Sequence, residues 1–154
     1  MLIVRWWDDW PELRLAAFAL PVQLAWEWGQ MPFYKAWGCE PLPTLAGYAL
    51  HCTAGDLMIL LGSYWMTSLI AGSRRFWRSS IRYSAIFVSS GLVYTAGSEW
   101  INVYALHRWD YSSAMPVAPW LGIGLSPLIQ WAVLPPLLLV AIRLTEPAVS
   151  VSRD

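Results

Sequence analysis

Residues 45–70 read LAGYALHCTAGDLMILLGSYWMTSLI, a run of 26 residues that contains no Lys or Arg and one acidic residue, Asp56. A helix that crosses the hydrocarbon core of a bilayer needs about 20 predominantly apolar residues. The run follows Pro41 and Pro43 and ends shortly before Gly72, and such residues are typical of the two ends of a helix. The stretch therefore predicts a membrane-spanning helix.

Three other segments have the same character and complete the predicted fold. They cover residues 11–31, 82–107 and 125–144. Residues 111–124 are also largely apolar, but their prolines and glycines favour an interfacial outer loop over a straight helix. We expect an all-α, polytopic membrane protein, in which residues 1–154 form a single integral membrane domain and a four-transmembrane-helix bundle. A soluble bundle of buried helices is the alternative, and it fits the few charged residues less well.

The composition agrees with a membrane protein and argues against a nucleic-acid-binding one. Of the 154 residues, 57% are hydrophobic and 13% are charged, and the mean hydropathy is +0.43. Soluble domains carry about 25% charged residues, roughly twice this share. The 12 tryptophans are typical of a chain with many residues at the membrane–water interface. Because the formal net charge is zero, no basic surplus is available to bind nucleic acid.

The cations are distributed unevenly between the loops, which predicts an orientation in the membrane. Cytoplasmic loops of membrane proteins carry an excess of Lys and Arg. Two cations, Lys35 and Arg108, lie in the loops after the first and third predicted spans. We therefore expect both termini and the loop between the second and third spans to be cytoplasmic, in a bacterial inner membrane. Eight cations support this: Arg5, Arg14, Arg74, Arg75, Arg78, Arg82, Arg143 and Arg153.

Polar residues inside the predicted spans gather in one layer of the membrane. Ionisable groups in this setting are energetically costly and are functional-site candidates by default. Each span places its polar residues on one helical face, and all of these faces reach the outer half of the bilayer in the predicted orientation. A polar chamber that opens to the outer side is a natural result. The residues are Gln23, Glu27, Gln30 and Tyr34; His51, Cys52 and Asp56; Thr95, Glu99 and Asn102; Ser126 and Gln130.

Acid–base chemistry is the activity that these residue types favour. In a chamber of low dielectric constant, one carboxyl group that stays protonated can act as an acid while another acts as a base. Such a pair suits the protonation of an apolar alkene or group transfer on a lipid. We expect the catalytic residues to be Glu27, His51, Asp56 and Glu99. We expect Gln30, Tyr34, Asn102, Trp109, Tyr111 and Gln130 to bind the substrate.

Two other interpretations of the same polar residues are open. Interhelical hydrogen bonds of roughly 0.6–2 kcal/mol each fasten many membrane helices without any chemistry. A His/carboxylate metal site at His51 is less favoured, because one histidine is few for zinc, and we expect no metal. The sequence lacks Gly-x-Ser-x-Gly, His-Glu-x-x-His, Walker A and nucleotide-binding motifs, so it predicts no particular cofactor.

Several motifs carry a resemblance to known membrane proteins. The sequences AWEWGQMPFY at 25–34, HCTAGD at 51–56, EWIN at 99–102, WDY at 109–111 and Met115-Pro116 together resemble a group of small uncharacterised bacterial four-span membrane proteins. The resemblance covers nearly the whole chain and implies no activity. The intramembrane Glu99, followed by Trp-x-Tyr and then Pro, is also similar to membrane carotenoid cyclases and hydratases. That resemblance implies lipid or isoprenoid chemistry, although this chain has fewer spans and lacks the Pro-Glu-Glu motif of the cyclases.

Three functions remain open from the sequence. The first is a membrane enzyme, or an enzyme-like binding protein, that takes a lipid or isoprenoid ligand from the bilayer. The second is a non-catalytic accessory or assembly subunit of a larger membrane complex. The third is a small transporter, which has to form a homo-oligomer because four spans enclose little space. The sequence leaves open whether the protein is an enzyme.

Overall fold

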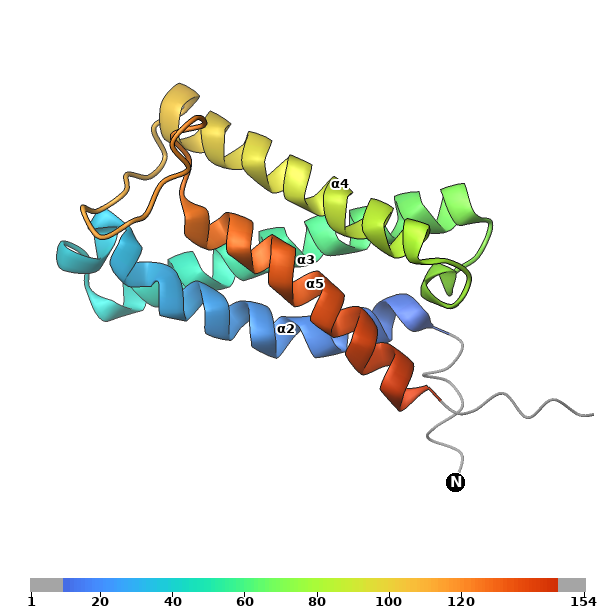
Figure 1. Cartoon of the computed structure of the whole chain (residues 1–154). Coiled ribbons are helices and arrows are strands. Elements are labelled where there is room, and N and C mark those ends of the chain that lie inside the picture. The colour runs from blue at the N-terminus through green and yellow to red at the C-terminus, as the bar shows by residue number, and fades with distance from the viewer. Residues whose placement is uncertain (1–9, 147–154) are drawn as a thin grey trace, which may run out of the picture.

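The computed structural model describes residues 10–146, and four long helices account for most of them (Figure 1). Within these residues the only β-structure is two isolated bridges, so the all-α class is confirmed. The helices are α2 (Pro11–Gln30), α3 (Leu42–Ala71), α4 (Ile81–Trp100) and α5 (Leu125–Thr145). Three helices match predicted spans to within a few residues, whereas α4 ends seven residues before the predicted end at 107 and is continued by a π-helix, η4 (Ile101–Ala105).

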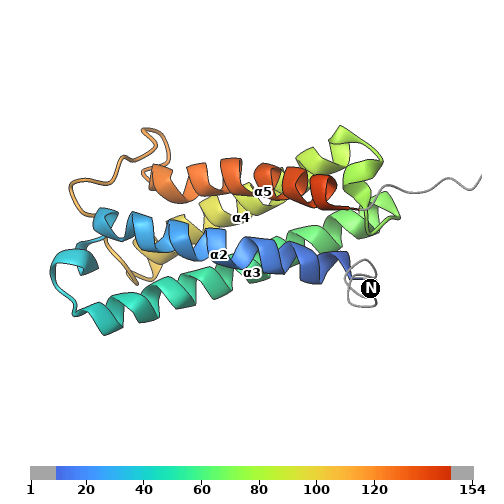
Figure 2. The ribbon, with the colours of Figure 1, turned by 90° about the horizontal axis from the view of Figure 1, so that it is seen from below.

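The helices run antiparallel to their chain neighbours, and α2 packs against α5 to close the bundle (Figures 1 and 2). One end holds the start of α2, the 3-10 helix η3 (Phe76–Arg78) and the end of α5, and we call it the η3 end. The other end holds the short 3-10 helices η1 (Met31–Phe33) and η2 (Lys35–Gly38) and the long connection 106–124. We call it the long-loop end. The predicted outer loop 111–124 lies here and contains no helix.

Local sequence signals explain where the helices begin and end. Pro11 opens α2 at a position where its missing N–H is not needed, and Pro41 precedes α3. Gly72 ends α3 with φ +62°, a left-handed conformation that favours glycine. The Ser80 side chain caps α4 by accepting a hydrogen bond from the backbone N–H of Arg82 at 3.2 Å.

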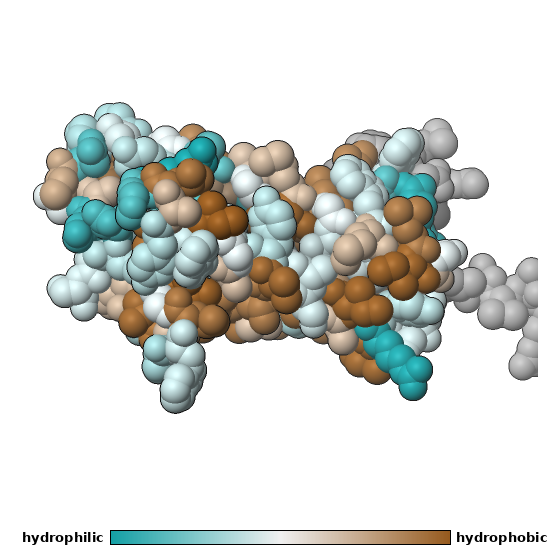
Figure 3. All heavy atoms as spheres, turned by 90° about the horizontal axis from the view of Figure 1, so that it is seen from above, coloured by the Kyte–Doolittle hydropathy of each residue, from teal (hydrophilic) through white to brown (hydrophobic). Residues whose placement is uncertain are grey.

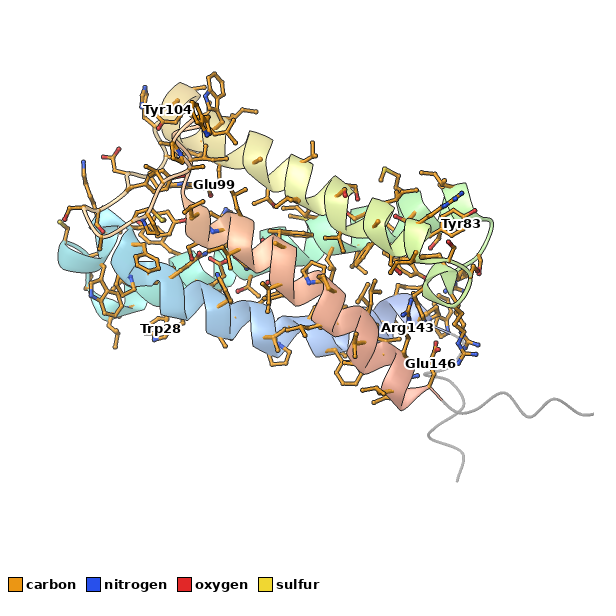
Figure 4. All side chains as sticks on the ribbon, viewed as in Figure 1. Trp28, Tyr83, Glu99, Tyr104, Arg143 and Glu146 are labelled. Atoms are coloured by element: carbon orange, nitrogen blue, oxygen red, sulfur yellow. The ribbon has the colours of Figure 1, made fainter. Side chains whose placement is uncertain are left out.

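The apolar core occupies the half of the bundle next to the η3 end. Ion pairs fasten the loop of η3 to the helix ends around it: Arg74 binds Glu12 of α2, and Arg78 Nε lies 2.5 Å from Glu146 Oε2 after α5. Trp77 in η3 donates to the same Glu146 carboxylate at 3.4 Å. Figure 4 shows Arg143 and Glu146 at this end of α5. The core residues are Leu15, Ala19, Leu60, Tyr64, Phe76, Trp77, Phe87, Trp131, Leu138, Leu139 and Ile142.

Two of the helices, α3 and α5, are long and apolar enough to cross a membrane, with mean hydropathies of 1.3 and 1.9. Only 22% of the apolar window of α3 is buried inside the bundle, whereas the core helix of a soluble protein is mostly buried. Leu69 on α3 is 83% exposed, and Met58 and Trp65 are exposed as well. Figure 3 shows apolar side chains along the surface of the bundle. Among the cations that predict the orientation, Arg5 and Arg153 lie outside the described residues.

Candidate functional site

A network of buried polar side chains fills the bundle toward the long-loop end, and the Gln130 amide of α5 lies at its centre. Gln130 Nε2 donates to Asp56 Oδ2 of α3 at 2.8 Å and to Glu27 Oε1 of α2 at 3.0 Å. The same nitrogen lies 2.8 Å from Gln23 Oε1. An amide nitrogen carries two hydrogens, so three acceptors share two donors. We call Glu27 and Asp56 the carboxyl pair.

Neutral donors on two helices hold the carboxyl pair in place. Gln30 Nε2 donates to Glu27 Oε1 at 2.8 Å, and Ser126 Oγ donates to Gln30 Oε1 at 2.7 Å. Trp131 Nε1 donates to Asp56 Oδ1 at 3.3 Å. Glu27 is 4% exposed. Within residues 10–146, the donors to the two carboxyl groups are amide and indole N–H groups, with no cation among them.

A second acidic centre lies where α4 meets the long loop. Tyr111 Oη donates to Glu99 Oε2 at 2.5 Å and accepts from the backbone N–H of Gly124 at 2.9 Å. The Tyr34 ring packs against the Tyr111 ring, with 5.8 Å between centroids. Burial and the hydrogen bond to Glu99 raise the pKa of Tyr111. Burial raises the pKa of Tyr34 most, followed by the charges of Glu99 and Glu27.

An irregular backbone positions these groups. The chain leaves α4 through a π-helix, η4 (Ile101–Ala105), and then reaches His107, which has φ +49°. π-helical turns are frequent at functional sites, and a positive φ is uncommon outside glycine. The backbone N–H of Lys35 then donates to Asp110 O at 3.0 Å, and Ser112 N–H donates to Phe33 O at 2.8 Å. This pairing places Tyr34 opposite Tyr111.

The structure brings most of the predicted site residues together. The carboxyl pair, Gln30 and Gln130 share one hydrogen-bond network. Glu99, Tyr111 and Tyr34 form the second centre, and Figure 4 shows Glu99 near the end of α4 that leads into the long loop.

The remaining predicted residues lie at the edge of these centres or outside them. Trp109 lies near the Glu99 carboxyl group, but its buried Nε1 atom has no hydrogen-bond partner within the described residues. Asn102 is buried, and its Nδ2 atom donates to Ser98 O at 2.8 Å. His51 is exposed and is not brought into the cluster. It lies five residues before Asp56, which is about 140° around the axis of α3.

Two residues that support the site, Trp131 and Gly91, are missing from the predicted set. The Trp131 indole donates to Asp56. Its ring lies against Gly91 of α4, where a Cβ atom would come within 2.1 Å of Trp131 Cζ3. The spacing of Gly91, Thr95 and Glu99 along one face of α4 was the available signal, because a small residue there admits a large one from a neighbouring helix.

Residues 10–146 contain no group of three or more His, Cys, Asp and Glu side chains that could hold a metal ion. Cys39 is an exposed free thiol, and Cys52 is a partly buried one. Cys52 shares a face of α3 with Asp56 and interacts with Glu27. The chemistry that these groups offer is therefore that of carboxyl, amide, phenol and thiol groups.

Replacing Tyr111 by phenylalanine should loosen the long loop. The change removes the phenol that donates to Glu99 and accepts from Gly124 N–H, so we expect the free energy of unfolding to fall by about 1–3 kcal/mol. Chemical unfolding of the purified protein would measure this. The matched control is Tyr94→Phe on the exposed surface of α4, which should change stability by less than about 0.5 kcal/mol. Equal stabilities of the two variants would contradict the assignment.

Comparison with known proteins does not supply a family for this chain. No protein-family model, curated protein or solved structure matches it. The resemblances to small bacterial membrane proteins and to carotenoid cyclases therefore stay predictions.

Proposed function

We propose that the chain is a four-span protein of the bacterial inner membrane, with the η3 end on the cytoplasmic side. Helices α2 and α4 have 20 residues each, a length of about 30 Å that matches the hydrocarbon core. Large apolar side chains are exposed on both, among them Phe18 and Leu20 on α2 and Val93 on α4. The charge bias of the described residues supports the orientation. Lys35 and Arg108 lie toward the long-loop end, against six arginines toward the η3 end: Arg14, Arg74, Arg75, Arg78, Arg82 and Arg143.

In this membrane setting, the polar network is a site for proton transfer to a lipid or isoprenoid ligand. The proposal rests on one observation: Glu27 and Asp56 both accept hydrogen bonds from the Gln130 amide, and the other donors around them are neutral. Glu27 is buried and Asp56 is partly buried. Two carboxylates in such a position without a cation are costly, whereas a carboxylic acid beside a carboxylate can form a hydrogen bond. The carboxyl pair is therefore stable as one acid and one base.

This arrangement offers a balanced proton exchange. The carboxylic acid of the pair transfers its proton to an alkene carbon or an oxygen of the ligand. The neighbouring carboxylate accepts a proton from the ligand, so the pair ends the cycle with the one proton it held at the start. A neutral carboxylic acid in a low-dielectric site is a known form of general acid. Glu99 at the end of α4 and Tyr111 in the long loop orient the ligand as it arrives from the outer leaflet.

Conservative amide substitutions test the proposal. Glu27→Gln and Asp56→Asn keep the size of each side chain and remove its acid–base chemistry. In a deletion strain, we expect both variants to accumulate in the membrane at wild-type levels. We expect each to form the missing lipid or pigment at least about a hundredfold more slowly than the wild type. The matched control is Asp110→Asn, an exposed residue whose partner is Lys35 at 3.4 Å, and it should restore the profile fully.

The outcomes of this experiment separate acid–base chemistry from a role in helix packing and from an accessory role. Full restoration by Glu27→Gln and Asp56→Asn would contradict acid–base chemistry. Loss of the variant proteins from the membrane would favour a role in helix packing. A partner protein that co-purifies with the wild type, and whose activity falls in the deletion strain, would favour an accessory subunit. None of these three results is expected from the geometry of the carboxyl pair.

A further inference from the structure

Arginine side chains outnumber the carboxylates around the 3-10 helix η3. Arg78 Nε lies 2.5 Å from Glu146 Oε2, and Arg75 Nε lies 3.6 Å from Oε1 of the same carboxylate. One negative charge therefore faces two positive charges. The Glu146 side chain is 3% exposed, whereas the side chains of Arg75 and Arg78 are 39% and 35% exposed. Both arginines thus stay open to a ligand from outside the bundle.

Two further arginines lie next to this group. Arg143 Nη2 donates to the backbone oxygen of Trp77 in η3 and to Ser84 Oγ at 3.3 Å. Because Ser84 belongs to the first turn of α4, Arg143 lies between η3 and the start of α4, where Arg82 is exposed. Within residues 10–146, neither Arg82 nor Arg143 has a carboxylate partner. We call Arg75, Arg78, Arg82 and Arg143 the arginine cluster.

The surplus of positive charge extends to the whole of this side of the chain. Next to the η3 end, the described residues hold six arginines against Glu12 and Glu146. Residues 1–9 and 147–154 add two arginines and three aspartates, which makes eight cations against five acidic residues. By contrast, the loop between α2 and α3 and the connection between α4 and α5 together hold two cations and two acidic residues.

Large apolar side chains are exposed directly beside the arginine cluster. Ile81 precedes Arg82 in the chain and is 75% exposed, and Leu144 follows Arg143 and is 81% exposed. Figure 3 shows apolar patches next to hydrophilic side chains toward this end of the bundle. The surface therefore combines two features, a group of cations and an apolar border.

Few classes of partner match both features. A free phosphate or a nucleic acid pairs with guanidinium groups but leaves the apolar border uncovered. A zwitterionic phospholipid covers the border, but its own cationic group offsets the attraction of its phosphate to arginine. An anionic phospholipid supplies acyl chains for the border and a headgroup with a net negative charge for the cations.

We propose that the arginine cluster binds the headgroup of an anionic phospholipid in the cytoplasmic leaflet, with an acyl chain along Ile81 and Leu144. Basic surfaces between membrane helices on the cytoplasmic side are typical sites for such lipids. The inference goes beyond the proposed proton transfer and rests only on the proposed membrane topology.

A comparison of three probes tests the class of the ligand. Full-length protein in a neutral detergent would be titrated with phosphatidylglycerol or with phosphatidylcholine of the same acyl chains, and native mass spectrometry would measure the bound lipid. Glycerol phosphate, a soluble phosphate without acyl chains, is the third probe. We expect phosphatidylglycerol to bind at least about tenfold more tightly than either of the other two.

Variants of Arg82 test whether the arginine cluster is the binding site. The side chain is exposed, so Arg82→Gln should leave the fold intact while it weakens phosphatidylglycerol binding about fivefold, the contribution of one arginine near a membrane surface. Arg82→Lys keeps the charge and should keep most of the affinity. The matched control is Arg108→Gln, which removes an exposed arginine from the long-loop end and should bind phosphatidylglycerol as the wild type does.

Each contrary result overturns a different part of the inference. Equal affinities of the wild type for the two lipids would show that the headgroup charge is not recognised. Equal weakening by Arg82→Gln and Arg108→Gln would show attraction to the overall charge of the protein and not to the arginine cluster. Glycerol phosphate that binds as tightly as phosphatidylglycerol would show a site for a soluble anion. These measurements do not involve the carboxyl pair, so the inference and the proposed proton transfer can each fail alone.

Discussion

Replacing Gly91 by alanine is expected to displace Trp131 and to lower the free energy of unfolding by about 2–4 kcal/mol. The new Cβ atom would lie 2.1 Å from Trp131 Cζ3 and 2.3 Å from Cε3, closer than any real contact. Trp131 is 1% exposed and packs in the apolar core, so the ring cannot move without shifting its neighbours. Overpacking of this kind costs about 1–3 kcal/mol, and the lost hydrogen bond to Asp56 adds about 1 kcal/mol.

Gly97→Ala provides a matched control on the same helix. A Cβ atom at Gly97 has no other atom within 4 Å, so alanine there should keep or slightly raise stability, by up to about 1 kcal/mol. Chemical unfolding of both variants in one detergent would measure the difference. A second substitution, Trp131→Leu, should restore part of the stability lost in Gly91→Ala but not the hydrogen bond to Asp56. If Gly91→Ala is as stable as Gly97→Ala, the result would contradict the close packing of Trp131 against Gly91 of α4.

Replacing Gln130 by leucine should destabilise the protein by about 3 kcal/mol or more. Leucine has a similar volume but no N–H group, so Asp56, Glu27 and Gln23 each lose a donor at 2.8–3.0 Å. An unsatisfied buried acceptor costs about 1–3 kcal/mol, and a charged one costs more. The loss should appear both in chemical unfolding and as a lower yield of folded protein.

A double-mutant cycle with Asp56→Asn isolates the role of charge in this effect. The asparagine amide is neutral and brings its own donors, so it needs the Gln130 amide less than a carboxylate does. We expect the double variant to be more stable than the sum of the two single effects predicts, by about 1 kcal/mol or more. Strict additivity would show that Gln130 does not act through Asp56.

The helices were predictable because the signals that define them are local. Residues 45–70 lie inside α3 (Leu42–Ala71), which begins after Pro41 and ends at Gly72. The convergence of Glu27, Asp56 and Gln130 also followed from the sequence, because residues at one depth on antiparallel helices meet if they face the same axis. Depth depends on a residue's place along its own helix, and successive spans that cross a bilayer alternate in direction.

The rest of the site depends on contacts between distant parts of the chain. Whether His51 is buried depends on which faces of α3 its neighbours cover, and His51 is left exposed. The partner of Trp131 is Gly91, 40 residues away in the chain, and no local pattern links the two. The same holds for Tyr34 and Tyr111, whose pairing follows from the π-helix after Glu99 and the left-handed turn at His107.

The half of the bundle next to the η3 end holds few ionisable groups along its helices. Between the level of Asp56 and that of Glu12 and Arg74, the four helices carry no carboxyl, amine or guanidinium group: residues 15–26, 57–71, 83–98 and 132–142. Tyr64, Phe76 and Phe87 close the axis there with fully buried rings. Under the proposed four-span topology, we therefore expect the carboxyl pair to exchange its protons with the side of the long loop.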